Sequence, residues 1–215
     1  PKPYQKPHPP LWVACSNIQT IGQAGSWGMG ALGFTFVSPD AAKAWVNKYY
    51  NNLLNNQTKL TDYPANPNIA MVAGFMCAET DEEAYEKAAG WTFFIFALSY
   101  YGRKGMDAPG KGDLWKEFQD WRYTEKAQAA FNGALIGSPD TIRKKLRIFK
   151  ESNVDQVILL NQAGNTSHED ICGSLQMFAD EIMPEFQADE AEHAQWKADV
   201  LSRKIVLEDL DTQAY

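Results

Sequence analysis

Residues Leu11–Phe36 read LWVACSNIQTIGQAGSWGMGALGFTF. The pattern predicts an apolar strand at Leu11–Cys15, a helix rich in glycine and alanine at Ile18–Trp27, and a second apolar strand at Ala31–Phe36. A polar turn of hydroxyl and amide side chains joins the first strand to the helix. Such a turn can bind an anion, because a helix N-terminus presents unpaired N–H groups and a partial positive charge. When the turn is considered in isolation, helix capping is the simpler explanation of its polar residues.

The alternation of strands and helices continues along the chain. Ser38 and Pro39 begin a capped helix. The continuous apolar run IAMVAGFMC at Ile69–Cys77 predicts a strand buried on both faces of a parallel sheet. Further along we expect a helix from Thr80 towards Tyr100, a helix that begins at Gly137–Asp140, a strand at Val154–Leu160 and a helix from His168 to about Phe186.

Four strands that alternate with helices predict right-handed βαβ units and a parallel sheet. Four such units are half of an eightfold β/α barrel, and a small open doubly wound sheet is the alternative; the pattern does not separate the two. In both architectures a ligand binds at the carboxyl ends of the strands. The candidate site therefore comprises residues 15–20, 34–38, 76–80 and 160–166.

Composition excludes several function classes. A net charge of -7 over 215 residues argues against nucleic acid as a partner, because phosphate neutralisation needs a basic face. The basic run at Arg143–Arg147 is better explained as the solvated face of a helix. We find no signal peptide and no apolar run long enough for a bilayer, which predicts a soluble, cytoplasmic protein without a membrane partner. Three distant cysteines favour a reducing compartment, and three histidines without ligand spacing argue against a metal site.

Three segments lie outside the alternating pattern. Residues 1–10 are rich in proline and form a connector. Residues near 102–122 form an insertion in the half-barrel, with a short helix at Asp113–Arg122, and a long insertion of this kind is typical of a lid or a binding loop. Residues 187–215 form a charged helical tail. The α/β unit itself is expected to span residues 11–186.

Four segments of the chain resemble the luciferase-like flavin monooxygenases. They read KPHPPLWVACSNIQT, ALGFTF, PNIAMVAGFMCAETDEEA and IGSPDTIRKKLRIFKESNVDQVILL, and the similarity runs from about Lys6 to Phe186. At Asn153 the family usually has glycine, and asparagine also adopts the left-handed conformation. The resemblance implies the C-terminal half of a TIM-type (β/α)8 barrel. It also implies a monooxygenase that oxidises a small organic substrate with O2 and reduced FMN, or binds F420 in a sister branch.

The resemblance also implies what this chain lacks. The family's usual catalytic histidine belongs to the N-terminal half-barrel, so the catalytic residues are expected there and this chain alone should be inactive. We expect the N-terminal half on the same or a partner chain, in preference to self-pairing, since half a barrel leaves two sheet edges open. A dimer and a flavin reductase are further expected partners. An F420-dependent oxidoreductase and a non-catalytic flavin-binding or partner subunit are the alternatives.

By the same resemblance, the turn after the first strand holds the flavin phosphate. The residues that match are Ser16 and Thr20, with the backbone N–H groups around Asn17 and Gln19.

Three aromatic residues match positions near the flavin ring or the substrate. Phe34 and Phe36 end the second strand, where aromatics are equally common as barrel core. Trp91 lies where the family has a tryptophan on the substrate side, although packing explains it as well. The insertion at Gly102–Trp121 matches the family's loop that shields the reduced flavin from water.

Overall fold

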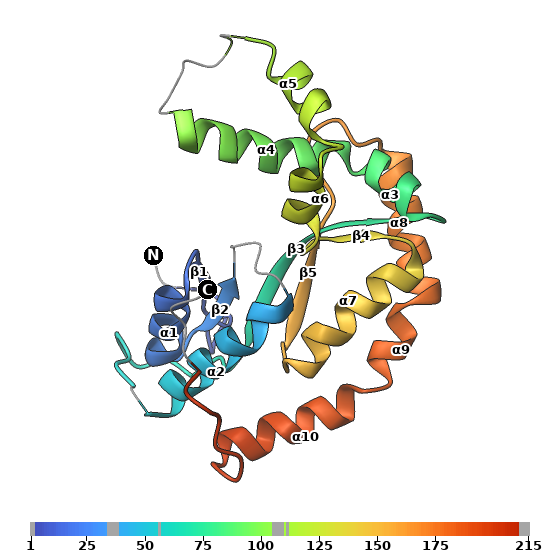
Figure 1. The fold of residues 1–215 in the computed structure, drawn as a ribbon. Helices are drawn as coiled ribbons and strands as arrows, with labels where there is room; N and C mark the ends of the chain where they lie inside the picture. Colours follow the sequence, from blue (N-terminus) through green and yellow to red (C-terminus); the bar gives the residue numbers. More distant parts are fainter. Residues whose placement is uncertain (1–2, 34–38, 56, 105–109, 111, 211–215) are drawn as a thin grey trace. The chain divides into compact units, whose positions relative to one another are not determined.

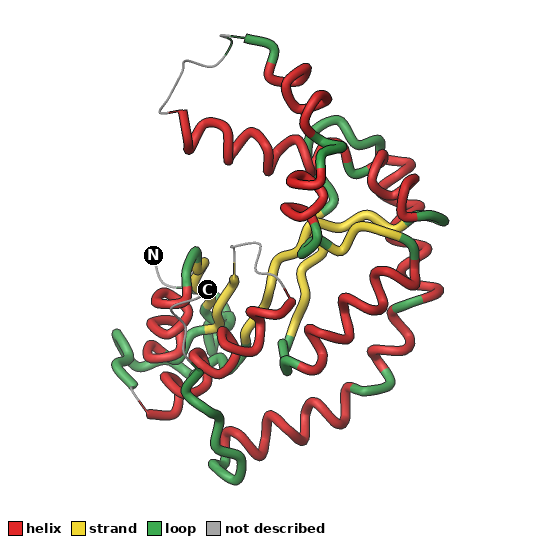
Figure 2. The backbone as a smooth tube through the Cα atoms, in the orientation of Figure 1, coloured by secondary structure: helices red, strands yellow, loops and turns green. Residues whose placement is uncertain are grey.

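The computed structural model describes residues 3–33, 39–55, 57–104, 110 and 112–210 (Figures 1 and 2). In this part of the chain the strands are β1 (Trp12–Cys15), β2 (Gly30–Gly33), β3 (Ile69–Cys77), β4 (Leu135–Gly137) and β5 (Gln156–Leu160). The helices are α1 (Ile18–Trp27), α2 (Pro39–Asn55), α3 (Asp81–Lys87), α4 (Ala89–Lys104), α5 (Leu114–Trp121), α6 (Glu125–Phe131), α7 (Pro139–Glu151), α8 (His168–Glu181), α9 (Met183–Gln187) and α10 (Glu190–Leu201).

The chain divides into two compact units. The first contains Pro1–Val72, Leu146–Ile158 and Glu185–Tyr215, and the second contains Ala73–Lys145 and Leu159–Pro184. Strands β3 and β5 therefore contribute residues to both units. The expected alternation of strands and helices is confirmed, since every strand pair with a defined register is parallel.

In the first unit, β1 pairs with β2 and β2 pairs with the first residues of β3. Helix α1 packs closely on α2 beside these strands (Figure 1). The close approach depends on Gly25, where a Cβ atom would lie 2.4 Å from the carbonyl oxygen of Tyr49. Tyr49 is itself fully buried, and its hydroxyl donates to the carbonyl oxygens of Met29 and Asn66, both at 2.9 Å. The sequence predicted α1 with its observed bounds.

In the second unit, the end of β3 pairs with β4, a three-residue strand that the sequence pattern did not reveal. All nine residues of β3 are buried, as its apolar composition predicts. Phe75 packs edge-on against Phe178 of α8, and the backbone N–H of Cys77 donates to the Ser174 hydroxyl at 2.6 Å. Gly74 and Met76 alternate with these residues and face the opposite side, towards α4. The strand is thus covered on both faces.

Two predicted helices are shorter than expected. The helix from Thr80 towards Tyr100 ends at Lys87 and restarts at Ala89. The break brings Gly90 against the loop after β5, where a Cβ atom would lie 2.1 Å from the Ala163 carbonyl oxygen. The helix from His168 to Phe186 likewise ends at Glu181, and α9 begins two residues later. Pro184 fits this second break, because proline lacks the N–H group that would continue α8 and is tolerated in the first turn of a new helix.

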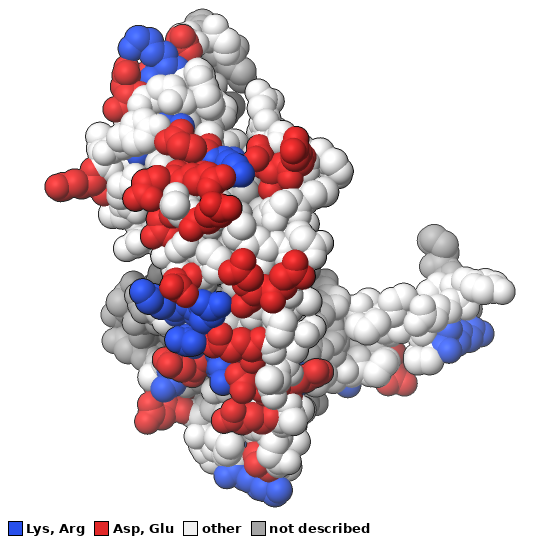
Figure 3. All heavy atoms as spheres, turned by 90° about the vertical axis from the view of Figure 1, so that its right-hand side faces the viewer, with Lys and Arg blue, Asp and Glu red and all other residues white. Residues whose placement is uncertain are grey.

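Charged side chains of α7 and the C-terminal helices form ion pairs at the surface. Arg147 pairs with Glu185 at 2.7 Å, and Lys150 pairs with Asp189 at 2.5 Å. The face drawn in Figure 3 shows acidic and basic side chains interspersed, with acidic ones more numerous. The prediction of a solvated basic face is confirmed only in part, because Lys144 and Arg147 are exposed whereas Lys145 is half-buried and its Nζ donates to the Ala134 carbonyl at 2.6 Å. None of the described helices is long and apolar enough to cross a membrane.

Candidate functional site

The turn between β1 and α1 lies at the carboxyl end of β1, where both candidate architectures bind their ligands. Asn17 is the N-cap of α1, and its side-chain oxygen accepts from the backbone N–H of Thr20 at 2.9 Å. The Thr20 hydroxyl accepts from the Asn17 N–H at 3.3 Å and donates to the Asn17 carbonyl at 2.8 Å. These contacts form a capping box. Asn17 therefore caps the helix.

Two further side chains of the turn lie at the surface. Ser16 and Gln19 are exposed, and the capping box does not use the amide N–H groups of Ile18 and Gln19. The first turn of α1 contains no acidic residue. No carboxylate in the first turn of α1 therefore compensates the positive end of the helix dipole.

Two other helices that follow strands differ from α1 in this respect. The first turn of α3 contains Asp81, Glu82 and Glu83, and that of α8 contains Glu169 and Asp170. Asp81 accepts from the backbone N–H of Ser138 at 2.7 Å, a bond that holds the pKa of its carboxyl below the ordinary value. Carboxylates therefore already occupy the positive ends of these helices. Of these three first turns, only that of α1 contains no acidic residue.

Cys15 is the last residue of β1, directly before the turn, and is fully buried. Its thiol donates to the carbonyl oxygens of Val13 and Thr20 at 3.3 and 3.4 Å, and burial raises its pKa. This is the environment of a buried structural thiol.

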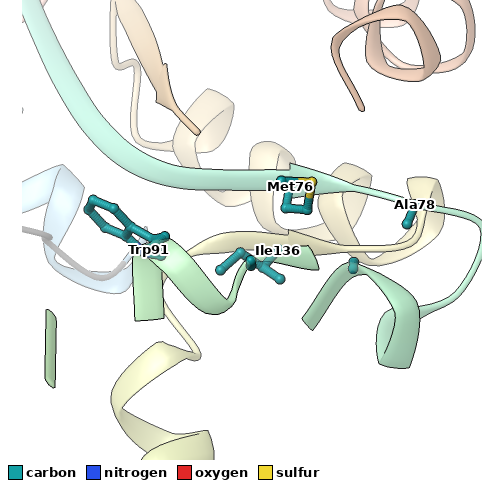
Figure 4. Packing of buried hydrophobic residues seen from close by; sticks show 6 residues of the cluster. Met76, Ala78, Trp91 and Ile136 are labelled. Carbon is teal, nitrogen blue, oxygen red and sulfur yellow. The ribbon is translucent and has the colours of Figure 1, made fainter. Parts of the chain in front are cut away.

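Trp91 lies in the apolar core of the second unit. It is 2% exposed and belongs to a cluster of buried residues that also includes Met76, Ala78 and Ile136 (Figure 4). The indole covers Gly74, so it lies on the face of β3 opposite α8. On the same helix, Phe94 is 39% exposed and Leu98 is 53% exposed. The other two aromatic candidates, Phe34 and Phe36, lie outside the described residues, as does the predicted cap Ser38.

The loop after β5 closes against the start of α4. Gly164 adopts a positive φ of 66°, and a Cβ atom there would lie 2.7 Å from the Gly90 Cα. Beside this contact, Phe93 and Trp115 line a cavity of about 600 Å³. Asn161 begins the loop and is 8% exposed, and its amide nitrogen has no hydrogen-bond partner in the described part of the chain.

The predicted insertion is partly described. Helix α4 extends to Lys104, and α5 confirms the short helix expected near Asp113–Arg122. Phe96 packs between the rings of Phe118 and Trp121, at centroid distances of 5.6 and 5.0 Å. The described part of the insertion is therefore a packed aromatic helix pair. Residues 105–109 and 111 lie outside the description.

A buried carboxylate at the opposite end of the strands escaped the sequence reasoning. Asp155 precedes β5, and its side chain is 3% exposed. One carboxylate oxygen accepts from the Tyr50 hydroxyl at 2.8 Å and from the Ile69 N–H at 2.7 Å. The other contacts His193 Nε2 at 2.9 Å and Lys197 Nζ at 3.1 Å.

The position of Asp155 indicates a structural role. Ile69 begins β3, so the network joins the amino ends of two strands to α2 and α10. In parallel β/α folds, residues at the amino ends of the strands stabilise the structure, whereas ligands bind at the carboxyl ends. Among the described residues no group of three or more metal-ligating side chains is found.

Comparison with known proteins supports the architecture and supplies a family. The model of the luciferase-like monooxygenases matches residues 1–156. No curated protein matches the chain. Solved structures of similar fold include the monooxygenase RslO1 from Streptomyces bottropensis, at 20% identity and a TM-score of 0.59, covering 86% of this chain and 51% of that one.

Two further structures differ in cofactor. The coenzyme F420-dependent tetrahydromethanopterin reductase from Methanopyrus kandleri has 20% identity and a TM-score of 0.59, covering 82% of this chain and 51% of that one. The other is the oxygenating constituent of 3,6-diketocamphane monooxygenase from Pseudomonas putida, solved with FMN. It has 21% identity and a TM-score of 0.53, and the match covers 82% of this chain and 49% of that one. This chain thus spans about half the length of the enzymes it matches. Its fold is that of half a (β/α)8 barrel.

Proposed function

Because the chain belongs to the luciferase-like monooxygenase family, we propose that it forms part of a flavin-dependent monooxygenase and holds the phosphate of reduced FMN at the β1–α1 turn. When bound, the flavin supplies the electrons and the oxygen chemistry, and the protein supplies binding, orientation and exclusion of water. The observation that carries this proposal is the first turn of α1, which lacks the carboxylates found in the first turns of α3 and α8.

Each residue of the turn has a defined part in this proposal. Ser16 donates its hydroxyl to a phosphate oxygen, and the amide N–H groups of Ile18 and Gln19 donate alongside it. Asn17 and Thr20 hold these amides in position through the capping box. The Thr20 hydroxyl also reaches the phosphate if it gives up its bond to the Asn17 carbonyl. Phe34, Phe36 and Trp91 remain candidates for the ring and substrate end.

A second cofactor has equal structural support. One of the similar structures is an F420-dependent enzyme, and F420 also carries a phosphate group that the same turn could hold. We place FMN first because the matching family model describes monooxygenases. A small organic molecule is the proposed substrate with either cofactor.

We further propose that a complementary half-barrel, on the same or another chain, completes the site. Strand β5 is less buried than β3: Ile158 is 38% exposed although it is apolar. Asn161 directly follows β5 with its buried amide nitrogen unsatisfied in the described part, and such atoms usually have a partner in the complete protein. About half of each matched enzyme has no counterpart in this chain, and we propose that the corresponding half-barrel covers Ile158 and completes the surroundings of Asn161.

The phosphate assignment is tested by titrating FMN and riboflavin onto the protein and its variants. Ser16→Ala should weaken FMN binding by about tenfold to a hundredfold, the loss of a hydrogen bond to a charged group. Riboflavin, which lacks the phosphate, should bind both proteins equally. Equal FMN affinity of the two proteins would remove Ser16 from the site.

Thr20→Ala needs its own control because it also removes part of a helix cap. Thr80→Ala is matched, since the Thr80 hydroxyl accepts from the Glu83 N–H at the start of α3. Both substitutions should cost about 1 kcal/mol of folding stability. Only Thr20→Ala should lower FMN affinity. Titration of F420 onto the same variants separates the two cofactors.

The half-barrel proposal predicts that this chain alone does not turn over. Oxygen consumption coupled to reduced flavin should stay at the background rate until the complementary half is added or fused. Turnover by the chain alone would contradict the proposal. FMN binding without turnover in the completed assembly would instead favour a non-catalytic flavin-binding subunit.

A further inference from the structure

Helix α8 places a cysteine and a histidine side by side on its surface. Cys172 follows His168 by one turn, and its sulfur lies 3.4 Å from His168 Nε2. Both side chains are exposed. A thiol next to an imidazole is the arrangement of an activated nucleophile, because the imidazole can take the thiol proton.

The other two cysteines have opposite surroundings. Cys15 and Cys77 are 0% and 2% exposed. Burial is the main cause that raises the pKa of both thiols, to about 11 for Cys77. They are therefore inert thiols and serve as internal controls for Cys172.

The space around Cys172 can accommodate a bulky adduct. The next residue is Gly173, and a Cβ atom added there would meet no atom within 4 Å. Ser174 is buried and points to the other side of the helix, where its hydroxyl accepts from the Cys77 N–H. The sulfur is thus approachable from the solvent side of α8.

The charged groups around the pair are already partly compensated. Glu169 and Asp170 lie in the first turn of α8, on the same helix as the pair. Asp170 accepts from the Ser167 hydroxyl and pairs with Lys87 of α3 at 3.3 Å. Glu169 is exposed to solvent. His168 therefore remains the neighbouring group that can exchange a proton with the sulfur.

We propose that Cys172 is a site of reversible thiolation by low-molecular-weight disulfides, with His168 as its base. The imidazole takes the thiol proton, and the thiolate attacks one sulfur of the disulfide. A new S–S bond forms to Cys172, the old one breaks, and the leaving thiolate takes the proton back from the imidazolium. One disulfide and one thiol thus give one mixed disulfide and one thiol. This inference does not rest on the proposed flavin site.

The test follows adduct formation with oxidised glutathione by intact-protein and peptide mass spectrometry under native conditions. Cys172 should form the adduct much faster than Cys15 or Cys77, and Cys172→Ser should remove the fast phase. After unfolding in denaturant the three cysteines should react at similar rates. Comparable native rates for all three, or a fastest reaction elsewhere, would overturn the site.

The role of His168 is tested by the pH dependence of the rate. His168→Ala and His168→Gln should each slow the reaction about tenfold near pH 7, where general-base catalysis matters most. Both should approach the wild-type rate in alkaline solution, where hydroxide removes the thiol proton. Continued protection of Cys77, which lies against α8, shows that the variants are folded. Wild-type rates near pH 7 in both variants would remove His168 from the proposal.

Discussion

Replacing Asp155 by asparagine is expected to lower the free energy of unfolding by about 3 kcal/mol, the cost of breaking a buried hydrogen-bonded charge pair. The carboxylate receives four contacts, from Tyr50, Ile69, His193 and Lys197. An amide at this position can still accept from Tyr50 and Ile69. It cannot accept from two further donors on its other side, because its nitrogen is itself a donor. Chemical denaturation monitored by circular dichroism measures the loss.

Asp189→Asn is the matched control for this substitution. Asp189 also pairs with a lysine of its own unit, but its side chain is 35% exposed, compared with 3% for Asp155. An exposed pair of this kind contributes about 0–1 kcal/mol. The two substitutions change the same atoms, so the difference between them isolates burial. Equal losses from both would contradict the structural role of the Asp155 network.

The Asp155 contribution should also depend on pH. Burial alone would raise the pKa of its carboxyl, but the His193 hydrogen bond, the Lys197 charge and the bonds from Ile69 and Tyr50 hold it below the ordinary value. A carboxyl whose pKa is lowered on folding stabilises the protein above its unfolded pKa, about 3.9, and loses this contribution as pH falls through the folded pKa. The free energy of unfolding that Asp155→Asn loses relative to the wild-type protein should therefore be constant from neutral pH to about pH 5. This loss should become smaller below pH 4. A deficit unchanged in that acid range would rule out a charge-based contribution.

Asp155 illustrates what the sequence does not reveal. It contacts Tyr50, Ile69 and His193, which lie 105, 86 and 38 residues away along the chain. Periodicity and capping signals report on neighbours within a few turns, so they carry no information about these partners. The resemblance to the family included Asp155 in an Asn-Val-Asp segment but gave it no role. The structure supplies that role by bringing three distant segments to one carboxylate.

The elements that the sequence predicted best are those whose signal is local and strong. Strand β3 is a run of nine apolar residues, and α1 lies between a capping residue and Gly28, which adopts the left-handed conformation at its C-cap. Strand β4 has only three residues and depends on pairing with the end of β3. Local patterns cannot place such elements.

The position of the candidate site could be predicted from the sequence, but the feature that distinguishes it from other helix starts could not. The turn at the end of β1 could be located from its polar residues, and the structure assigns the cap to Asn17. The absence of acid from the first turn of α1 was also visible in the sequence. This absence becomes informative only by comparison with α3 and α8, whose first turns contain acidic residues. That comparison requires the helix boundaries, which the structure supplies.

Replacing Gly74 by alanine is expected to lower the free energy of unfolding by about 3 kcal/mol, the upper end of the usual cost of overpacking. The added Cβ atom would lie 2.0 Å from Nε1 of Trp91 and 2.1 Å from its Cε2 atom. The indole is 2% exposed and packed against Met76 and Ile136, so it cannot move aside without losing burial. Gly173→Ala is the control, because a Cβ atom there meets no neighbour and an alanine within a helix should stabilise the protein by up to about 1 kcal/mol.

A double-mutant cycle with Trp91→Leu identifies the cause. If the loss arises from the indole, Gly74→Ala should cost less than about 1 kcal/mol in the Trp91→Leu background, because contacting residues are not additive. Near-ultraviolet circular dichroism should change in Gly74→Ala, since Trp91 must leave its present position. A cost independent of residue 91 would mean that the backbone at Gly74, and not the indole above it, requires glycine. The close contact between Gly74 and the indole would then not be the cause of the loss.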